Sequence, residues 1–523
     1  MNSCEMKAIL NANCALEQRL FYMGFYATTA KENKHCWSDL LKGWNTFLLD
    51  DMNFFVHPKQ SFYMYHMDNI SIALIGHAYH PYRMMDNEDE ILRMLTQVDN
   101  GNFFDEICSL TGIYTIIWKD NEDCWKILGD ASGMQTVYYC QNRDEIHISS
   151  HINLLGDILD LTIDPYVEHL SKYRFYKLLG DALPGDLTKF SQIKRLVPNH
   201  YVRFGDTVQC YRFHTPEVRK MDYAAIVDEA SMLLHNNLQL ISQKWKKPAI
   251  SLTGGCDSKT TLACANGLYD RFSYFSYISS EEELVDAEAA HNICNQVLGY
   301  DDKHTIYTIS GEDEAFADIE AHRAVLFYNS GSLRKTNLND VRKRCYFASV
   351  DDFDVEVKSW VSEVGRAYYS KRFNNRTKFP KTPTPRVCTT MYKFFFHNRK
   401  LVKQTDAVFA EYLKQFPLNS KTIPWQEQFF WEFRVPSWNG NVITGEHRYS
   451  YDIAIPYNNC KLLELLLSVP LQDRISDRLY MDMRKKMNSE IDATGIHVQN
   501  LKHTSNRAKI ENLYFCLHSR FPL

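Results

Sequence analysis

The segment from Pro248 to Thr261 is the sequence feature that most restricts how this chain folds. It contains a short apolar stretch, two adjacent glycines, and then residues suited to the first turn of a helix. Adjacent glycines let the backbone turn tightly and expose its N–H groups to an anion, and a following helix adds the positive end of its dipole. The order of strand, glycine turn and helix therefore predicts a phosphate-binding loop.

Two adjacent glycines alone would indicate an ordinary glycine-rich turn. The other side chains of this loop indicate a nucleotide-binding loop instead. Asp257 is able to hold a metal ion on the phosphates, and several hydroxyls lie beside it. The loop is not of the G-x-x-x-x-G-K-[ST] type, because Lys259 follows Ser258 rather than preceding it. The predicted nucleotide-binding residues are Ser251, Thr253, Gly254, Gly255, Asp257 and Ser258, with Asp257 as the metal ligand.

Composition limits the class of protein. The 523 residues are enough for two to four domains, and 45% hydrophobic with 24% charged residues is typical of a folded globular chain. A net charge of -5 gives no reason to expect nucleic acid or a membrane as a partner. The fourteen cysteines include no C-x-x-C pair, so no spacing predicts zinc. With no apolar N-terminal segment and no long apolar run, we expect a cytoplasmic protein with reduced thiols.

The pattern of expected elements changes near residue 215. Short apolar runs between 110 and 150, joined by polar turns, predict an antiparallel meander. An extended segment is also expected over Phe21–Tyr26. After Tyr223, expected helices and strands alternate, which is typical of a parallel sheet with crossover helices. We therefore predict an α/β protein with one domain over 1–215 and a second over 216–523.

Several motifs, in their order along the chain, resemble those of the asparagine synthetase family, which includes β-lactam synthetases and lasso peptide cyclases. The phosphate loop is similar to the family's S-G-G-x-D-S loop, with Thr253 in place of the second serine. The other matching segments are Leu110–Tyr114, Leu128–Gly133, Val137–Tyr139, Ile193–His200 and Tyr451–Pro456. The resemblance implies an N-terminal glutaminase-like Ntn-hydrolase α/β/β/α sandwich, followed by an ATP-pyrophosphatase domain that uses ATP and Mg²⁺.

The N-terminal part departs from this family where glutamine would be hydrolysed. Asn2 stands in place of the nucleophilic cysteine, and Cys4 would need cleavage after Ser3 to become the N-terminus. Ile75 precedes Gly76 where the family has an asparagine that stabilises the oxyanion. The glutamine-gripping R-G-P-D loop has no counterpart. We therefore expect an inactive scaffold rather than a glutaminase.

The resemblance also implies catalytic residues in the C-terminal part. In the segment from Lys358 to Tyr368, Glu363 and Tyr368 match the family's glutamate and tyrosine, while Ser362 replaces a metal-binding aspartate. Glu363 could equally be a solvated carboxylate at a helix start. Lys502 lies in a segment that resembles the one with the catalytic lysine. Its rivals for that role are Lys485 and Lys486, and Asp286 and Glu288 are further candidate polar ligands.

The function implied is that of an AMP-forming amide synthetase or cyclase. ATP would activate a small-molecule or peptide carboxylate as an acyl adenylate, which an amine then attacks. Two alternatives remain open at this point: a glutamine-dependent amidotransferase that uses a processed Cys4, and an ATP-binding pseudoenzyme. The resemblance allows a homodimer.

Overall fold

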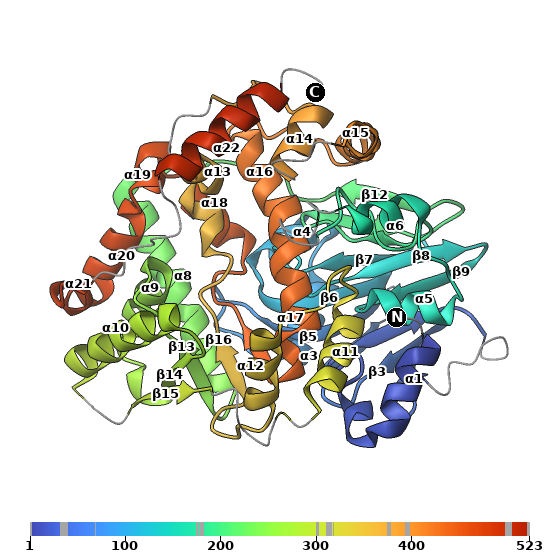
Figure 1. The fold of residues 1–523 in the computed structure, drawn as a ribbon, viewed down its shortest axis with the longest axis horizontal. Coiled ribbons are helices and arrows are strands. Elements are labelled where there is room, and N and C mark those ends of the chain that lie inside the picture. The colour runs from blue at the N-terminus through green and yellow to red at the C-terminus, as the bar shows by residue number, and fades with distance from the viewer. Residues whose placement is uncertain are drawn as a thin grey trace.

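The computed structural model describes most of the chain. The described residues are 3–31, 40–67, 70–173, 176, 182–299, 303–309, 316, 318–373, 378–392, 398–496 and 505–519. They form a mixed α/β structure with three sheets, shown in Figure 1.

Two six-stranded antiparallel sheets form the N-terminal part. The first has the strand order β10-β8-β9-β1-β3-β2, and the second has the order β12-β11-β7-β6-β5-β4. The strands of the first are β1 Phe25–Thr28, β2 Asn45–Leu49, β3 Met52–Val56, β8 Tyr138–Asn142, β9 Glu145–Ser149 and β10 Lys194–Arg195. Those of the second are β4 Phe62–Met67, β5 Ile70–Tyr79, β6 Thr111–Lys119, β7 Trp125–Gly129, β11 His200–Arg203 and β12 Gln209–Arg212.

The two sheets pack face to face, and helices cover their outer faces. One apolar cluster joins Phe25 and Phe54 of the first sheet to Ile75 of the second. On the outer face of the second sheet, Ile72 packs with Leu92 of α3 (Glu88–Gln97) and with residues of α4 (Asn100–Ser109). Helix α5 (Ile152–Ile158) packs against the first sheet beside β9. The result is four layers in the order α, β, β, α.

The prediction of a single antiparallel meander is wrong in one respect. Strand β7 pairs with β6, and β8 pairs with β9, but β7 and β8 belong to different sheets. The chain crosses between sheets at a turn in which the Asp130 carboxylate accepts the backbone N–H groups of Ser132, Met134 and Gln135. The extended segment expected over Phe21–Tyr26 is also shorter, because Phe21 and Met23 have positive φ angles and the strand begins at Phe25.

A five-stranded parallel sheet forms the centre of the C-terminal part, as the alternating pattern predicts. Its strand order is β15-β14-β13-β16-β17, so the chain starts at the central strand, extends to one side, and then returns to the other. The strands are β13 Pro248–Ser251, β14 Ser273–Ile278, β15 His304–Thr308, β16 Val355–Val357 and β17 Asp452–Ala454. The sequence predicted no strand at β15. Strand β17 lies between residues 393 and 482, where the sequence pattern predicts mostly helix.

Helices cover this sheet and fill the space between it and the antiparallel layers. Apolar periodicity in the sequence predicts helices over Tyr223–Gln243 and Asp286–Leu298. Both are present, as α8 and α10, and α10 begins five residues earlier than predicted, at Glu281. The remaining α-helices are α1 Ser3–Ala12, α6 Pro165–Lys172, α9 Cys256–Cys264, α11 Ile319–Ser330, α12 Leu338–Ala348, α13 Tyr368–Arg372, α14 Pro385–Tyr392, α15 Arg399–Gln415, α16 Trp425–Phe429, α17 Asn441–Gly445, α18 Cys460–Leu467, α19 Leu471–Ile475, α20 Arg478–Asn488, α21 Glu490–Ala493 and α22 Ser505–His518. Helices α8 and α10 span Tyr223–Lys244 and Glu281–Leu298.

Buried polar contacts join the antiparallel layers to the C-terminal part. Asn458, completely buried, donates to the Gly112 carbonyl at 2.6 Å and to the Asp130 carboxylate at 2.8 Å. Trp431 Nε1 donates to the Ala131 carbonyl at 2.8 Å. Figure 1 shows α16 and α17, in orange, running between the green parallel sheet and the blue antiparallel layers. The two parts therefore share a closely packed junction.

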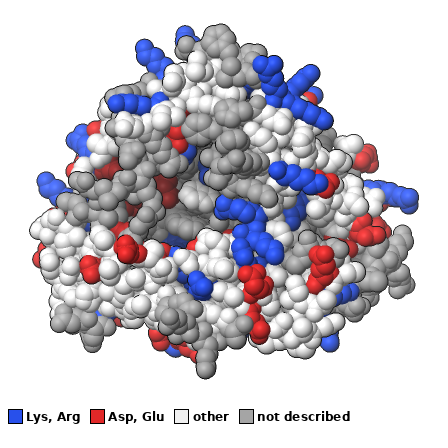
Figure 2. Space-filling view, viewed as in Figure 1, with Lys and Arg blue, Asp and Glu red and all other residues white. Residues whose placement is uncertain are grey.

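The surface carries both signs of charge. The face shown in Figure 2 carries both lysine or arginine and aspartate or glutamate side chains, in keeping with the small net charge of -5. Within the described part of the chain, no helix combines the length and the apolar character needed to cross a bilayer.

Replacing Asn458 by alanine tests the junction. The variant leaves the Gly112 carbonyl and the Asp130 carboxylate without their buried donor, so we expect a loss of about 2–3 kcal/mol in the free energy of unfolding. Urea denaturation measures this loss. The control is Asn102→Ala on the exposed surface of α4, which should change stability by less than about 0.5 kcal/mol. Equal stability of both variants would contradict the role assigned to Asn458.

Candidate nucleotide site

A cavity of about 400 Å³ lies at the carboxyl ends of β13, β14 and β16. Strand order reverses between β13 and its two neighbours, and in open parallel sheets this reversal leaves a crevice where ligands bind. The strand register brings Ser251 opposite Phe275, and Ile250 opposite Val357, so the residues that follow these strands meet at one edge. The lining residues are Ser251, Leu252, Thr253, Gly255, Asp257, Ser258, Phe275, Ser276, Tyr277, Glu283, Asp286, Ala287, Lys358, Ser359, Trp360, Glu363 and His447.

The glycine loop has the predicted order of strand, turn and helix. Ser251 ends β13, and Gly255 is the N-cap of α9. The Thr253 N–H donates to Ser258 Oγ at 2.9 Å, and the Gly255 N–H donates to Thr253 Oγ1 at 3.1 Å. Two of the three predicted ligand hydroxyls thus also hold the loop in shape. All predicted loop residues except the buried Gly254 line the cavity.

Asp257 lies in the first turn of α9 and forms an ion pair with Arg366. Burial raises the pKa of this carboxyl, while the charge of Arg366 opposes the rise. Its second oxygen, Oδ1, is buried and has no hydrogen-bond partner among the described residues. An unpaired carboxylate oxygen in a cavity fits the oxygen chemistry that Mg²⁺ prefers. Asp257 therefore remains suited to hold a metal ion through Oδ1.

Arg366 has a second partner, Asp477. Its Nε and Nη2 atoms donate to the two Asp477 oxygens at 2.9 and 2.8 Å, and Lys371 Nζ lies 2.6 Å from the same carboxylate. Asp477 therefore keeps Arg366 paired even when Asp257 binds another cation.

Glu363 lies in a short 3-10 turn, Ser362–Arg366, and its partly buried side chain lines the cavity. Burial raises the pKa of Glu363 to about 7, with a further contribution from the negative charge of Asp257. Val361, just before the turn, has a φ of 73°, which is strained for a β-branched residue. The turn is held by the Tyr480 hydroxyl, which donates to the Ser362 carbonyl at 2.7 Å. The fold thus fixes a carboxyl that titrates near neutral pH.

Lys358 is a cavity residue to which sequence reasoning gave no role. It follows β16 directly, and its ammonium group lies 2.6 Å from the buried carboxylate of Glu356. Burial lowers the pKa of Lys358, and the Glu356 charge counteracts this effect. His447 lies 3.7 Å from Glu356 and also lines the cavity. Its position immediately after a buried strand is the one sequence feature that could have predicted Lys358 as a site residue.

Other predicted residues lie elsewhere. Tyr368 is not among the lining residues; its ring stacks on Phe430 with a centroid separation of 4.5 Å. Lys485 and Lys486 are exposed on α20, and Glu288 is exposed on α10, whereas Asp286 lines the cavity. Lys502 and Asn2 lie outside the described residues.

Two of the N-terminal residues weighed as glutaminase parts lie within the described part of the chain. Cys4 is exposed within α1. Ile75 lies in the apolar core between the two antiparallel sheets. An alkyl side chain in such a core offers no hydrogen-bond donor to an oxyanion.

A larger cavity, of about 1740 Å³, opens at the opposite edge of the parallel sheet. Lys246, Lys247 and Asp354, which precede β13 and β16, belong to its lining, together with residues of α1 and of the antiparallel layers. The glycine loop lies at the smaller cavity, at the carboxyl ends of the strands, which is the edge where open parallel sheets bind their ligands.

Comparisons with known proteins add only weak structural likenesses. No family model matches the chain, and no curated protein matches its sequence. The solved structure of the allosteric regulatory enzyme of purine biosynthesis is similar with a TM-score of 0.24 and 10% identity, over 47% of this chain and 58% of that one. Glutamine phosphoribosylpyrophosphate amidotransferase from B. subtilis, complexed with ADP and GMP, is similar with a TM-score of 0.23 and 10% identity, over 48% and 58%. This chain thus spans just over half the length of each, and likenesses of this size carry no argument.

The raised pKa of Glu363 predicts a pH-dependent effect of Glu363→Gln. Below about pH 4.5 the Glu363 carboxyl is protonated in both the folded and the unfolded state. Between about pH 4.5 and 7 only the folded state binds the proton, so the free energy of unfolding falls as pH rises. Glutamine imitates the protonated form. Without nucleotide or metal, the variant should be more stable than the parent by roughly 3 kcal/mol near pH 8, but only by roughly 1 kcal/mol near pH 5.

Urea unfolding at both pH values measures this difference. The control is Glu288→Gln, because Glu288 is an exposed carboxylate on α10. A Glu363→Gln effect that is the same at both pH values would rule out a carboxyl with a raised pKa.

Proposed function

We propose that this chain is an ATP-dependent, AMP-forming amide synthetase or cyclase of the asparagine synthetase type. The observation that carries the proposal is the cavity at the strand-order reversal, where the glycine loop, the start of α9 and the buried Asp257 oxygen meet. The motif order along the chain supports the same assignment.

The cavity residues suit each step of such a reaction. A substrate carboxylate attacks the α-phosphorus of ATP, and the bond to pyrophosphate breaks. The N–H groups in the first turn of α9, the dipole of that helix and Lys358 would stabilise the negative charge that collects on pyrophosphate. An amine then attacks the acyl carbon and AMP leaves. Glu363, with a pKa of about 7, is suited to accept the proton that the amine loses.

Asp257 would hold Mg²⁺ through its free oxygen, and the ion would neutralise charge on the phosphates. Arg366 would keep its pair with Asp477 in that state. In this proposal the antiparallel layers are a scaffold, and the amine comes from ammonia, from a second substrate or from the same molecule. The carboxylate is a small molecule or a peptide.

The Asp257–Arg366 ion pair favours a second candidate, an ATP-binding pseudoenzyme. Arg366 already neutralises the predicted metal ligand, and Ser362 stands where a second metal carboxylate is expected from the resemblance. Such a chain would bind ATP without Mg²⁺ and would not turn it over.

Binding of a non-hydrolysable ATP analogue, with a methylene between the α and β phosphates, distinguishes the two candidates. Isothermal calorimetry should show that Mg²⁺ strengthens binding, and that Asp257→Asn removes about tenfold in affinity or more. Lys358→Met should cost a similar factor, because a cation is lost from the cavity. Lys246→Met, at the opposite edge of the sheet, should change affinity by less than about twofold. Equal affinity with and without Mg²⁺ would favour the pseudoenzyme.

Exchange of radioactive pyrophosphate into ATP tests the chemistry directly, because adenylation is reversible before the amine arrives. With a panel of carboxylic acids and peptides, the correct acid should produce exchange, and Asp257→Asn should abolish it. Adding the amine should release AMP and pyrophosphate in equal amounts. Release of ADP and phosphate would contradict the proposed reaction.

A further inference from the structure

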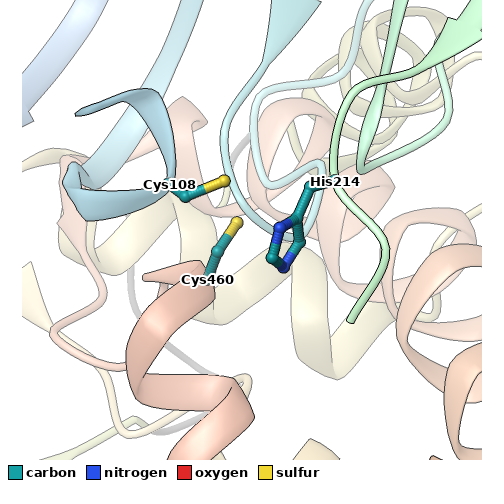
Figure 3. A group of neighbouring side chains, drawn as sticks. All are labelled: Cys108, His214 and Cys460. Atoms are coloured by element: carbon teal, nitrogen blue, oxygen red, sulfur yellow. The ribbon is translucent and has the colours of Figure 1, made fainter. Parts of the chain in front are cut away.

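Three side chains with metal-binding atoms converge at the junction of the two parts of the molecule. They are Cys108 near the end of α4, His214 in the segment after β12, and Cys460 in the first turn of α18. One ligand atom from each lies within 4.8 Å of the others. Figure 3 shows both sulfur atoms and one ring nitrogen of His214 turned toward a common point.

The surroundings of His214 match those of a metal-binding histidine. Its Nε2 atom lies 3.1 Å from the Glu464 carboxylate, which leaves the other ring nitrogen toward the sulfurs. Glu464 is itself held by Arg219 at 2.6 Å and by the Glu217 N–H at 3.0 Å. A carboxylate on the far nitrogen of a ligating histidine fixes its orientation and increases its basicity.

Isolated buried cysteines are common in protein cores, where they behave as small apolar residues. Cys264, Cys294 and Cys388 are of this kind, as each is buried within an apolar cluster or helix interface. Cys108 and Cys460 differ, because a polar histidine with its own carboxylate faces them. Among the described residues, theirs is the single group of three such side chains whose ligand atoms converge.

We propose that Cys108, Cys460 and His214 bind one Zn²⁺ ion as a structural site. Zinc bonds of about 2.3 Å to sulfur and about 2.0 Å to nitrogen place tetrahedral ligand atoms about 3.5–3.8 Å apart. The ligand atoms here lie within 4.8 Å of one another, so side-chain shifts of about 1 Å would bring them to bonding positions. The two thiolates would neutralise the charge of the ion, and Arg219 neutralises the charge of Glu464. A buried site needs this balance, because an unpaired charge is costly to bury. The three side chains supply three of the four tetrahedral ligands and water supplies the fourth, so this site differs from closed structural zinc sites, in which the protein supplies all four.

The ligands come from three segments far apart in the sequence, so the ion would connect them. Cys108 belongs to a helix on the antiparallel layers, His214 to the connection between the two parts, and Cys460 to a helix after the last strand of the parallel sheet. None of the three lines the nucleotide cavity. The site would therefore stabilise the junction rather than take part in the reaction.

Metal content of the full chain, expressed with zinc in the medium, tests the proposal. Elemental analysis should find about one zinc per chain, and Cys108→Ser, Cys460→Ser and His214→Ala should each reduce it below about a tenth. The matched control is Cys294→Ser in α10, which should retain the zinc. Absence of zinc from the parent chain, or copper in its place, would overturn the assignment.

Cobalt substitution tests the ligand set in the parent chain itself, so it does not depend on the folding of any variant. The parent chain, stripped of metal and loaded with Co²⁺, should show the thiolate-to-cobalt charge-transfer absorption and the visible bands of a tetrahedral ion. X-ray absorption of the zinc form should give two sulfur neighbours at about 2.3 Å. A spectrum with oxygen and nitrogen neighbours only would overturn the proposed ligand set.

Discussion

The reversal of strand order at β13 is the constraint on which the candidate site depends. Because the chain leaves β13 toward β14 and β15 and later returns to β16 and β17, the connections from neighbouring strands diverge. Divergence leaves a crevice at the carboxyl edge, and the glycine loop, Lys358 and Glu363 gather around it. A sheet with strands in simple sequential order would place these connections on one face and close the crevice.

Electrostatics then determine what this crevice is able to bind. Asp257 and Glu363 bring two carboxyls into a partly buried space. Burial raises the pKa of both, and the negative charge of Asp257 raises the pKa of Glu363 further. Arg366, which Asp477 holds in place, pairs with Asp257 and opposes the rise in its pKa. An incoming metal ion would replace one cation with another, so binding need not create an unpaired buried charge.

The antiparallel layers are connected to the parallel sheet by buried groups rather than by a flexible linker. Asn458 donates across the junction to the carbonyl of Gly112 in β6, and Trp431 donates to the carbonyl of Ala131 in the turn after β7. The Cys108, His214 and Cys460 group lies at the same junction. The antiparallel layers are therefore integral to the folded molecule.

The sequence by itself determined the local elements. Apolar periodicity and turn residues predicted the short strands between 110 and 150 and the long helix α8, because these elements depend on neighbouring residues. For the same reason, the double glycine predicted the loop and the start of α9. Tertiary structure alone decided which strands share a sheet, so that β7 and β8 separate, and which distant charges meet. The ion pair of Asp257 with Arg366 and the approach of Cys108 to Cys460 join residues about 110 and 350 positions apart, and no local pattern encodes such contacts.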